Sequence, residues 1–361
     1  MEQRETPVVN AFNEWDPLEE IVVGIVDDAR IPAWDTIMPA VVHDRRLWDF
    51  YKTWGGTPWP TDVLLKAEED VEAFVDVLEQ AGVTVRRPER FRWDQPISTP
   101  DWSQPSSCYA LMPRDVLLVV GDLIIEAPMG WRSRYFEHLA YKALCKEYFR
   151  GGARWISAPR PQLSDASYDQ RFVPMTEGEA QRFLPTEFEP LFDAADAIKC
   201  GRDVFIGRSS CCNSFGIEWL RRHLGPEYTV HEVDVYDTHP MHLDATLYPL
   251  APGKLLIHPD RVATVPEVFV KAGWDVLVCP EPEMPETHPM YNCSRWIMMN
   301  VVMLDEHRVI VSAGEKRFAR TLKSWGFEPI ECPFWDFETI GGGFHCASVD
   351  IRRRGMLRSY L

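Results

Sequence analysis

A pattern of strand, charged turn, strand, helix and strand recurs along the chain and limits the folds that it can adopt. The four complete copies share this order of elements and cover residues 113–161, 194–234, 245–280 and 297–333. A fifth copy, at residues 18–89, lacks one strand. The segment CASVDIRR, residues 346–353, has strand character and no partner of its own, so we expect it to supply the missing strand. The sequence therefore predicts a ring of five ββαβ modules that is closed by the last strand.

A doubly wound α/β sheet is the alternative, because it also alternates helices and strands. Its parallel units leave no place for short charged hairpin turns such as DEHR at residues 305–308. Glycines also stand where a helix C-cap needs a left-handed residue, at Gly82, Gly273 and Gly326. We therefore expect an α/β fold with pseudo-fivefold symmetry, in one domain that spans residues 1–361, of which residues 1–10 are expected to be flexible.

The composition argues against some classes of partner and favours one cellular compartment. A formal net charge of −17 argues against nucleic acid or an anionic membrane surface as a partner. The longest apolar runs are too short to cross a bilayer, and the first residues are polar, unlike a signal peptide. Nine dispersed cysteines without a zinc-type spacing favour a reduced, cytoplasmic protein that holds no metal.

Polar residues recur at the entrance to the first strand of each module. They are Asp115, Asp193, His242 with Asp244, Cys293 with Ser294, and Cys346 at the closing strand. Equivalent positions of a ring lie close together around its axis. We therefore expect a thiol, an imidazole and three carboxylates to meet at one mouth.

This set of groups favours covalent chemistry on a planar cation. A thiolate is a nucleophile, and a nearby imidazole can lower its pKa and carry protons. Carboxylates can bind a guanidinium group through paired hydrogen bonds. The predicted reaction is attack by Cys346 on a guanidinium carbon.

Structural explanations exist for each residue taken singly. Asp115 resembles a turn residue, and Asp193 resembles a helix cap. His345 is a second candidate base, but neighbours on a strand point to opposite faces, so His242 is preferred over it. Only the recurrence at one place in the repeat favours a functional reading. The three glycines at 341–343 are expected to let the backbone bend and carry Cys346 into the mouth.

The chain resembles the amidinotransferases, and most closely the arginine:glycine type. The motifs that carry the resemblance are long, keep a fixed order and include NEWDPLEEIVVG, GIEWLRRHL, PMHLDAT, HPDR and GGGFHC. They cover nearly all of residues 10–361. The resemblance implies the five-bladed α/β propeller of the pentein fold, which arginine deiminases share. It also implies an enzyme that needs no cofactor, and a homodimer is possible.

The resemblance also assigns roles to individual residues. Cys346 is similar to the nucleophile that becomes an amidino-cysteine, His242 to the general acid and base, and Asp193 to its acidic partner. Asp115 and Asp244 resemble the carboxylates that hold the donor guanidinium. Three further matches lie at the substrate: Arg261 at the donor carboxylate, and Ser294 and Cys293 at a pair that is Ser-Ser in the glycine enzymes.

The predicted activity is ping-pong transfer of the amidino group of L-arginine to an amine, with release of ornithine. His239 stands where the glycine enzymes have asparagine, while Met241 is retained, so the acceptor is left open between glycine, lysine or another ω-amino acid, and a natural-product amine. Guanidino-compound biosynthesis in secondary metabolism is the expected setting. The alternatives are an arginine deiminase-type hydrolase and a non-catalytic protein that binds arginine.

Overall fold

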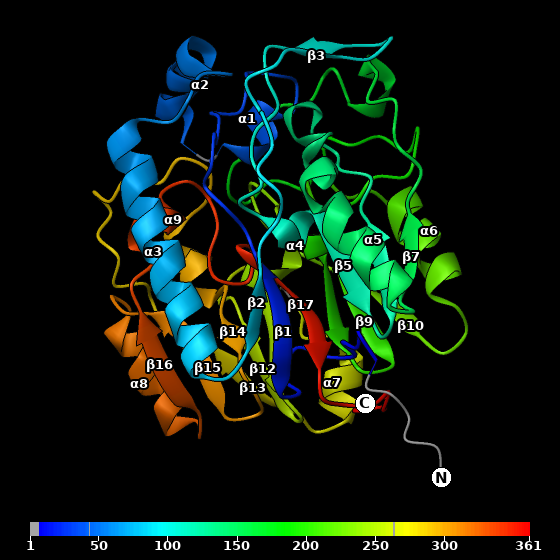
Figure 1. Ribbon diagram of the computed structural model, residues 1–361, viewed down its shortest axis with the longest axis vertical. Coiled ribbons are helices and arrows are strands. Elements are labelled where there is room, and N and C mark those ends of the chain that lie inside the picture. The colour runs from blue at the N-terminus through cyan, green and yellow to red at the C-terminus, as the bar shows by residue number, and fades with distance from the viewer. Residues whose placement is uncertain (1–6, 43, 263) are drawn as a thin grey trace.

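The computed structural model describes residues 7–42, 44–262 and 264–361. Its strands form five three-stranded sheets and one small hairpin (Figure 1). The sheets have the strand orders β17 (Ser348–Arg353), β1 (Leu18–Val23), β2 (Thr84–Arg86); β5 (Leu117–Val120), β6 (Leu123–Glu126), β7 (Arg154–Ser157); β8 (Ala197–Cys200), β9 (Asp203–Gly207), β10 (Thr229–Val233); β11 (Leu247–Ala251), β12 (Lys254–Ile257), β13 (Asp275–Val278); and β14 (Val302–Met303), β15 (Arg308–Ser312), β16 (Glu328–Cys332). The hairpin pairs β3 (Ile97–Ser98) with β4 (Ser103–Gln104).

All five sheets are built in the same way. The first two strands of each order are antiparallel, and the second and third are parallel. A helix on the outside of the molecule connects each parallel pair; these helices are α3 (Thr61–Gln80), α5 (Lys142–Arg150), α6 (Ser214–Leu224), α7 (Glu267–Lys271) and α8 (Lys316–Ser324). The predicted module is confirmed at the level of strand pairing.

The last strand completes the first module, as predicted. β17 pairs with β1 in antiparallel fashion, with Val22 opposite Val349 and Val23 opposite Ser348, and the two lie side by side in Figure 1. Residues 1–6 of the stretch expected to be flexible lie outside the described residues. Val9 is buried, and the backbone N–H of Asn10 donates to the carbonyl of Ile351 at 2.9 Å.

The glycines that follow the helices behave as expected. The φ angles of Gly82, Gly273 and Gly326 are 84°, 71° and 101°. Residues that carry a side chain disfavour such positive φ angles. Each of the three glycines ends a helix one or two residues before the parallel strand begins.

Short helical turns precede the first strands, where the sequence led us to expect strand. They are α4 (Pro113–Val116), η5 (Ala194–Asp196), η6 (Leu243–Ala245) and η7 (Arg295–Met299). α4 contacts η5, η5 contacts η6, η6 contacts η7, and α4 also contacts β17. Asn300, the C-cap of η7, accepts a hydrogen bond from the backbone N–H of Cys346 at 2.8 Å. The turns therefore form a closed circuit at one end of the sheets.

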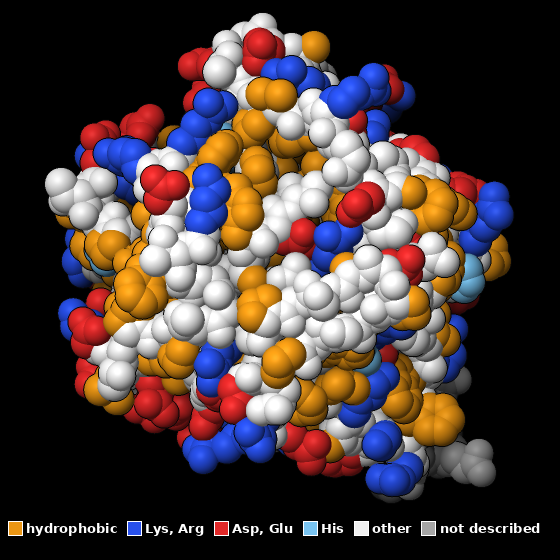
Figure 2. Space-filling model, turned by 90° about the horizontal axis from the view of Figure 1, so that it is seen from above, with side chains coloured by type: hydrophobic (Ala, Val, Ile, Leu, Met, Phe, Trp, Pro, Cys, Tyr) orange, Lys and Arg blue, Asp and Glu red, His pale blue; other side chains and the backbone are white. Residues whose placement is uncertain are grey.

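The remaining elements lie in the connections between these units. They are α1 (Met38–Val41), η1 (Arg45–Leu47), α2 (Trp48–Trp54), η2 (Arg132–Arg134), η3 (Glu137–Tyr141), η4 (Asp165–Ser167) and α9 (Trp335–Glu338). Figure 2 views the end that carries α1 and α2, where most charged side chains lie around the periphery. None of the helices in the described ranges combines the length and the apolar character that a membrane span requires.

Candidate active site

One pocket collects nearly all of the residues predicted for the site. Its wall includes Asp115, His239, Met241, His242, Asp244, Arg261, Cys293, Ser294 and Cys346. The tenth predicted residue, Asp193, lies behind this wall and contacts His242. The structure thus brings together the side chains from four modules and from the turn before the closing strand, while their roles stay predictions.

Cys346 stands on a tight turn just before β17, so the expectation that the closing strand begins at this residue is wrong. The backbone N–H of Ala347 donates to the carbonyl of Gly343 at 2.9 Å, which folds the chain back on itself. Gly341 has a φ of 124°, and a Cβ at Gly342 would lie 2.5 Å from the Met112 sulfur. The glycines are needed for this bend and for the close approach of the segment that carries Met112.

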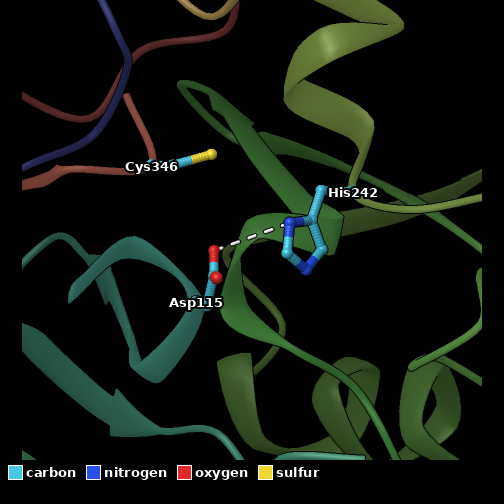
Figure 3. A group of neighbouring side chains, drawn as sticks. All are labelled: Asp115, His242 and Cys346. Carbon is cyan, nitrogen blue, oxygen red and sulfur yellow. Dashed lines mark ion pairs between the residues drawn. The ribbon is translucent and has the colours of Figure 1, made fainter. Parts of the chain in front are cut away.

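His242 lies between two carboxylates and close to the thiol. Its Nε2 is 3.2 Å from Asp193 Oδ2, and its Nδ1 is 3.5 Å from Asp115 Oδ1. Figure 3 shows the imidazole and Asp115 on one side of the pocket and Cys346 facing them. A ring nitrogen of His242, a carboxylate oxygen of Asp115 and Cys346 Sγ all lie within 4.8 Å of one another.

Asp193 combines the functional and the structural explanations given for it. It is the N-cap residue of η5, and its backbone N–H donates to Asp196 Oδ2 at 2.9 Å. Its own carboxylate is fully buried and contacts His242. The helical turn therefore fixes the carboxylate that orients the imidazole.

The side chain of Asp244 forms a hydrogen bond with His345. The Nδ1 of His345 is 2.7 Å from Asp244 Oδ2, and its Nε2 is 3.4 Å from Glu14 Oε2. Cys346 Sγ lies 3.8 Å from the same Asp244 oxygen. Both ring nitrogens of His345 are thus engaged by carboxylates, and His345 does not line the pocket, which agrees with the preference for His242 as the base.

The charges around the site shift the pKa values of its two reactive groups. Burial raises the pKa of the Cys346 thiol to about 12, and the negative charge of Asp244 adds to this effect. Burial opposes a charged His242, but Asp115, Asp193 and Cys346 together raise its pKa well above the usual value. The resting site thus holds a neutral thiol beside an imidazolium.

Alkylation tests this protonation state. We expect neutral iodoacetamide to modify Cys346 slowly at pH 7, with a rate that rises about tenfold per pH unit toward pH 10, because the reactive thiolate fraction grows below a raised pKa. Asp244→Asn should increase the rate at pH 8, since it removes a negative charge that disfavours the thiolate. Mass spectrometry of the Cys346 peptide measures both rates. A rate that is already level at pH 7 would contradict the raised pKa.

Arg261 sits at the other end of the pocket. Its Nε donates to Asp237 Oδ2 at 2.7 Å, and one Nη2 proton reaches Ser294 Oγ at 3.3 Å. Among the described residues, Nη1 has no hydrogen-bond acceptor, so the predicted carboxylate contact can be made there. Cys293 contributes a neutral thiol, because burial raises its pKa well above the usual value.

His239 lines the pocket next to Met241, at the place expected for the acceptor. Burial lowers the pKa of His239, and Arg45 and Arg261 also disfavour its charged form. The neutral form of this imidazole is therefore favoured.

Three charged or amide side chains of the pocket wall were not predicted from the sequence. They are Arg134, Asp237 and Asn292. Asp237 and Asn292 lie in loops without a helix or strand pattern. Arg134 has a sequence signal, an Arg-x-x-Glu spacing at residues 134–137, which is the spacing of an ion pair on a helix.

The donor atoms of the site also suit a metal, since Asp, His and Cys are all ligands of zinc. The same atoms are those that covalent chemistry at a guanidinium carbon uses. The geometry of these three residues alone therefore leaves both explanations standing.

Comparison with known proteins shows which proteins the chain resembles. No protein-family model matches the chain. It is 49% identical over 357 residues to an L-arginine:L-lysine amidinotransferase of Pseudomonas savastanoi pv. phaseolicola, covering 99% of this chain and 98% of that protein. It is 46% identical over 362 residues to the mitochondrial glycine amidinotransferase of Danio rerio, covering 99% of this chain and 85% of that one. The solved structure of SxtG, an amidinotransferase of saxitoxin biosynthesis from Microseira wollei, superposes with a TM-score of 0.93 at 44% identity, covering 98% of this chain and 99% of the other.

Proposed function

The chain belongs to the amidinotransferase family, and from this premise we propose that it moves the amidino group of L-arginine to the terminal amine of an amino acid such as lysine. The observation that carries the reaction type is the cluster of Cys346, His242 and Asp115 within 4.8 Å. A nucleophile, a proton carrier and a cation-binding carboxylate are the groups that the transfer needs.

The first half of the reaction forms an amidino-cysteine. Asp115 and Asp244 hold the guanidinium group, and Arg261 binds the carboxylate of arginine. The bound guanidinium cation favours ionisation of the neutral thiol, so Cys346 gives its proton to solvent as arginine binds. The thiolate then attacks the guanidinium carbon and forms a C–S bond. The C–N bond to ornithine then breaks, and the proton held on His242 passes to the departing amine.

The second half reverses these steps with a new amine. The acceptor amine gives a proton to His242 and attacks the same carbon. The C–S bond breaks, so that the thiolate and the imidazolium are restored. Asp193 stabilises the imidazolium in both halves, since its buried carboxylate is 3.2 Å from Nε2.

The acceptor is proposed from the two contacts that a substrate makes in the pocket, one with Arg261 and one with Cys346. Ornithine leaves with its carboxylate near Arg261 and its amine near Cys346. An amino acid with an amine at the end of a similar side chain can make the same two contacts. Glycine carries both groups on one carbon and cannot make them together. The relative at 49% identity is named for lysine, which supports this choice.

The arrangement of the sheets supports the finer fold proposal. Five sheets of one pattern, a last strand that completes the first sheet and a closed circuit of helical turns fit a five-bladed α/β propeller that forms one catalytic domain. A homodimer, a cytoplasmic location, a role in secondary metabolism and independence from cofactors stay predictions.

Isotope exchange tests the mechanism apart from the acceptor. With arginine and labelled ornithine as the only substrates, we expect labelled arginine to form, because the first half of the reaction is reversible. An arginine deiminase-type hydrolase would instead yield citrulline, and a non-catalytic binding protein would leave both compounds unchanged. Mass spectrometry after arginine alone should find an adduct on Cys346.

A screen of amines, with arginine as the donor, tests the acceptor. We expect a higher kcat/KM for lysine than for glycine, and His239→Asn should move the ratio toward glycine by about tenfold, because the smaller carboxamide changes the pocket beside Met241. Ornithine release measures each rate. The acceptor proposal fails if the unaltered enzyme prefers glycine and His239→Asn leaves the ratio unchanged.

A further inference from the structure

The carboxylate of Asp115 shares its charge with a buried arginine. Arg134 Nη1 donates to Asp115 Oδ2 at 2.7 Å, and Arg134 is 2% exposed. Asp115 Oδ1 is buried and accepts no hydrogen bond from the described part of the chain. His242 Nδ1 lies 3.5 Å from this second oxygen, which a ligand in the pocket would therefore share with the imidazole.

An arginine at this position works against binding of a cation. Two like charges on one carboxylate repel each other strongly where water is excluded. Unless its charge is offset, Arg134 would lower the affinity of Asp115 for a guanidinium group. The residue lines the pocket but is almost fully buried, so bulk solvent screens its charge little.

Glu137 offsets this charge from the far side. Arg134 donates to it through Nε at 3.0 Å and through Nη2 at 2.8 Å, and Glu137 is 1% exposed. Glu137 does not line the pocket. It therefore makes no contact with a ligand in the pocket, and its salt bridge is to Arg134.

We propose that Glu137, in its ionised form, gives the pocket its preference for a cationic donor, because it neutralises Arg134 and so leaves more of the charge of Asp115 to the substrate. Glu137 is thus a specificity-determining residue that touches no substrate. This inference rests on the proposed function, in which Asp115 binds the guanidinium group of arginine.

Arginine and citrulline distinguish a charge effect from a purely structural one. Citrulline has the shape of arginine but carries a neutral ureido group. Loss of a structural ion pair should weaken both ligands alike, whereas loss of charge balance should weaken arginine alone. Dissociation constants are measured by calorimetry in the Cys346→Ala background, which prevents turnover. The measurements are made at pH 9, because burial raises the pKa of Glu137 to about 8 in spite of Arg134.

Two variants should shift the preference in opposite directions. Glu137→Gln is expected to weaken the binding of arginine by about tenfold, while the affinity for citrulline changes by less than about twofold. A tenfold change in affinity equals the free energy of a shift of about one pKa unit. Arg134→Gln should raise the preference for arginine, since it removes the competing cation. The matched control is Glu126→Gln, which removes a buried carboxylate that pairs with Lys142 and Arg160 away from the pocket; it should leave the ratio unchanged.

If Glu137→Gln changes the dissociation constants of both ligands equally, the inference is overturned. If Glu137→Gln does not fold, an equal change for both ligands in Arg134→Gln overturns it instead. A parent protein that binds arginine but shows an unchanged ratio in the variants leaves the proposed function standing. A parent protein that does not bind arginine overturns both.

Discussion

Cys346→Ala and Cys346→Ser are expected to abolish ornithine formation, with a loss of at least about 10⁴-fold in kcat, because loss of a nucleophile removes the covalent route altogether. Neither side chain can form the amidino-cysteine: alanine has no nucleophile, and the serine hydroxyl ionises far less readily than a thiol. The pocket that binds arginine remains, since Asp115, Asp244 and Arg261 are unaltered.

Three measurements accompany this result. Calorimetry should show that Cys346→Ala still binds arginine, and circular dichroism should show an unchanged fold. Cys145→Ser, at a buried cysteine on the outer helix α5, serves as the control for loss of a thiol and should keep its turnover. Retention of more than about a hundredth of the activity in Cys346→Ala would contradict the assignment of the nucleophile.

His242→Ala is expected to lower kcat by about 10³-fold or more, because no other group near the thiol can protonate the departing amine. Arg261→Ala should instead raise KM for arginine by about tenfold or more with a smaller change in kcat, since it contacts a part of the substrate remote from the reacting carbon. Steady-state kinetics on the two variants separate chemistry from binding.

The matched control is His223→Ala, at an exposed histidine on α6, which should leave both constants unchanged. The assigned roles are wrong if His242→Ala and Arg261→Ala show the same pattern of kcat and KM.

The strand pattern predicted the modules because alternation, hairpin turns and C-cap glycines are local features. It did not predict the helical turns at the site. Segments such as AAD before β8 and IMM before β14 are apolar and only a few residues long, so no helical period can show in them. These segments form turns because they bring polar side chains to the circuit. The circuit depends on tertiary contacts, which a local sequence pattern does not contain.

The site residues were predictable to the extent that they recur in the repeat. Equivalent positions brought Asp115, His242 and Cys346 into one pocket, as expected. The groups behind them were missed, because their positions depend on contacts between modules. His345, for example, is next to Cys346 in the chain, but its partners Asp244 and Glu14 come from distant segments. The neutral state of His239 likewise depends on burial and on Arg261.

The pairing of β1 with β17 has a consequence for biosynthesis. Four modules lie between β1 and β17 in the chain, so one edge of β1 is without its partner while these modules are synthesised. An open strand edge favours pairing with other chains, and contacts between distant segments form slowly. The nascent chain therefore depends on protection of that edge until β17 emerges. Because Cys346 lies just before β17, the reactive thiol is added to the protein only as this last gap is about to close.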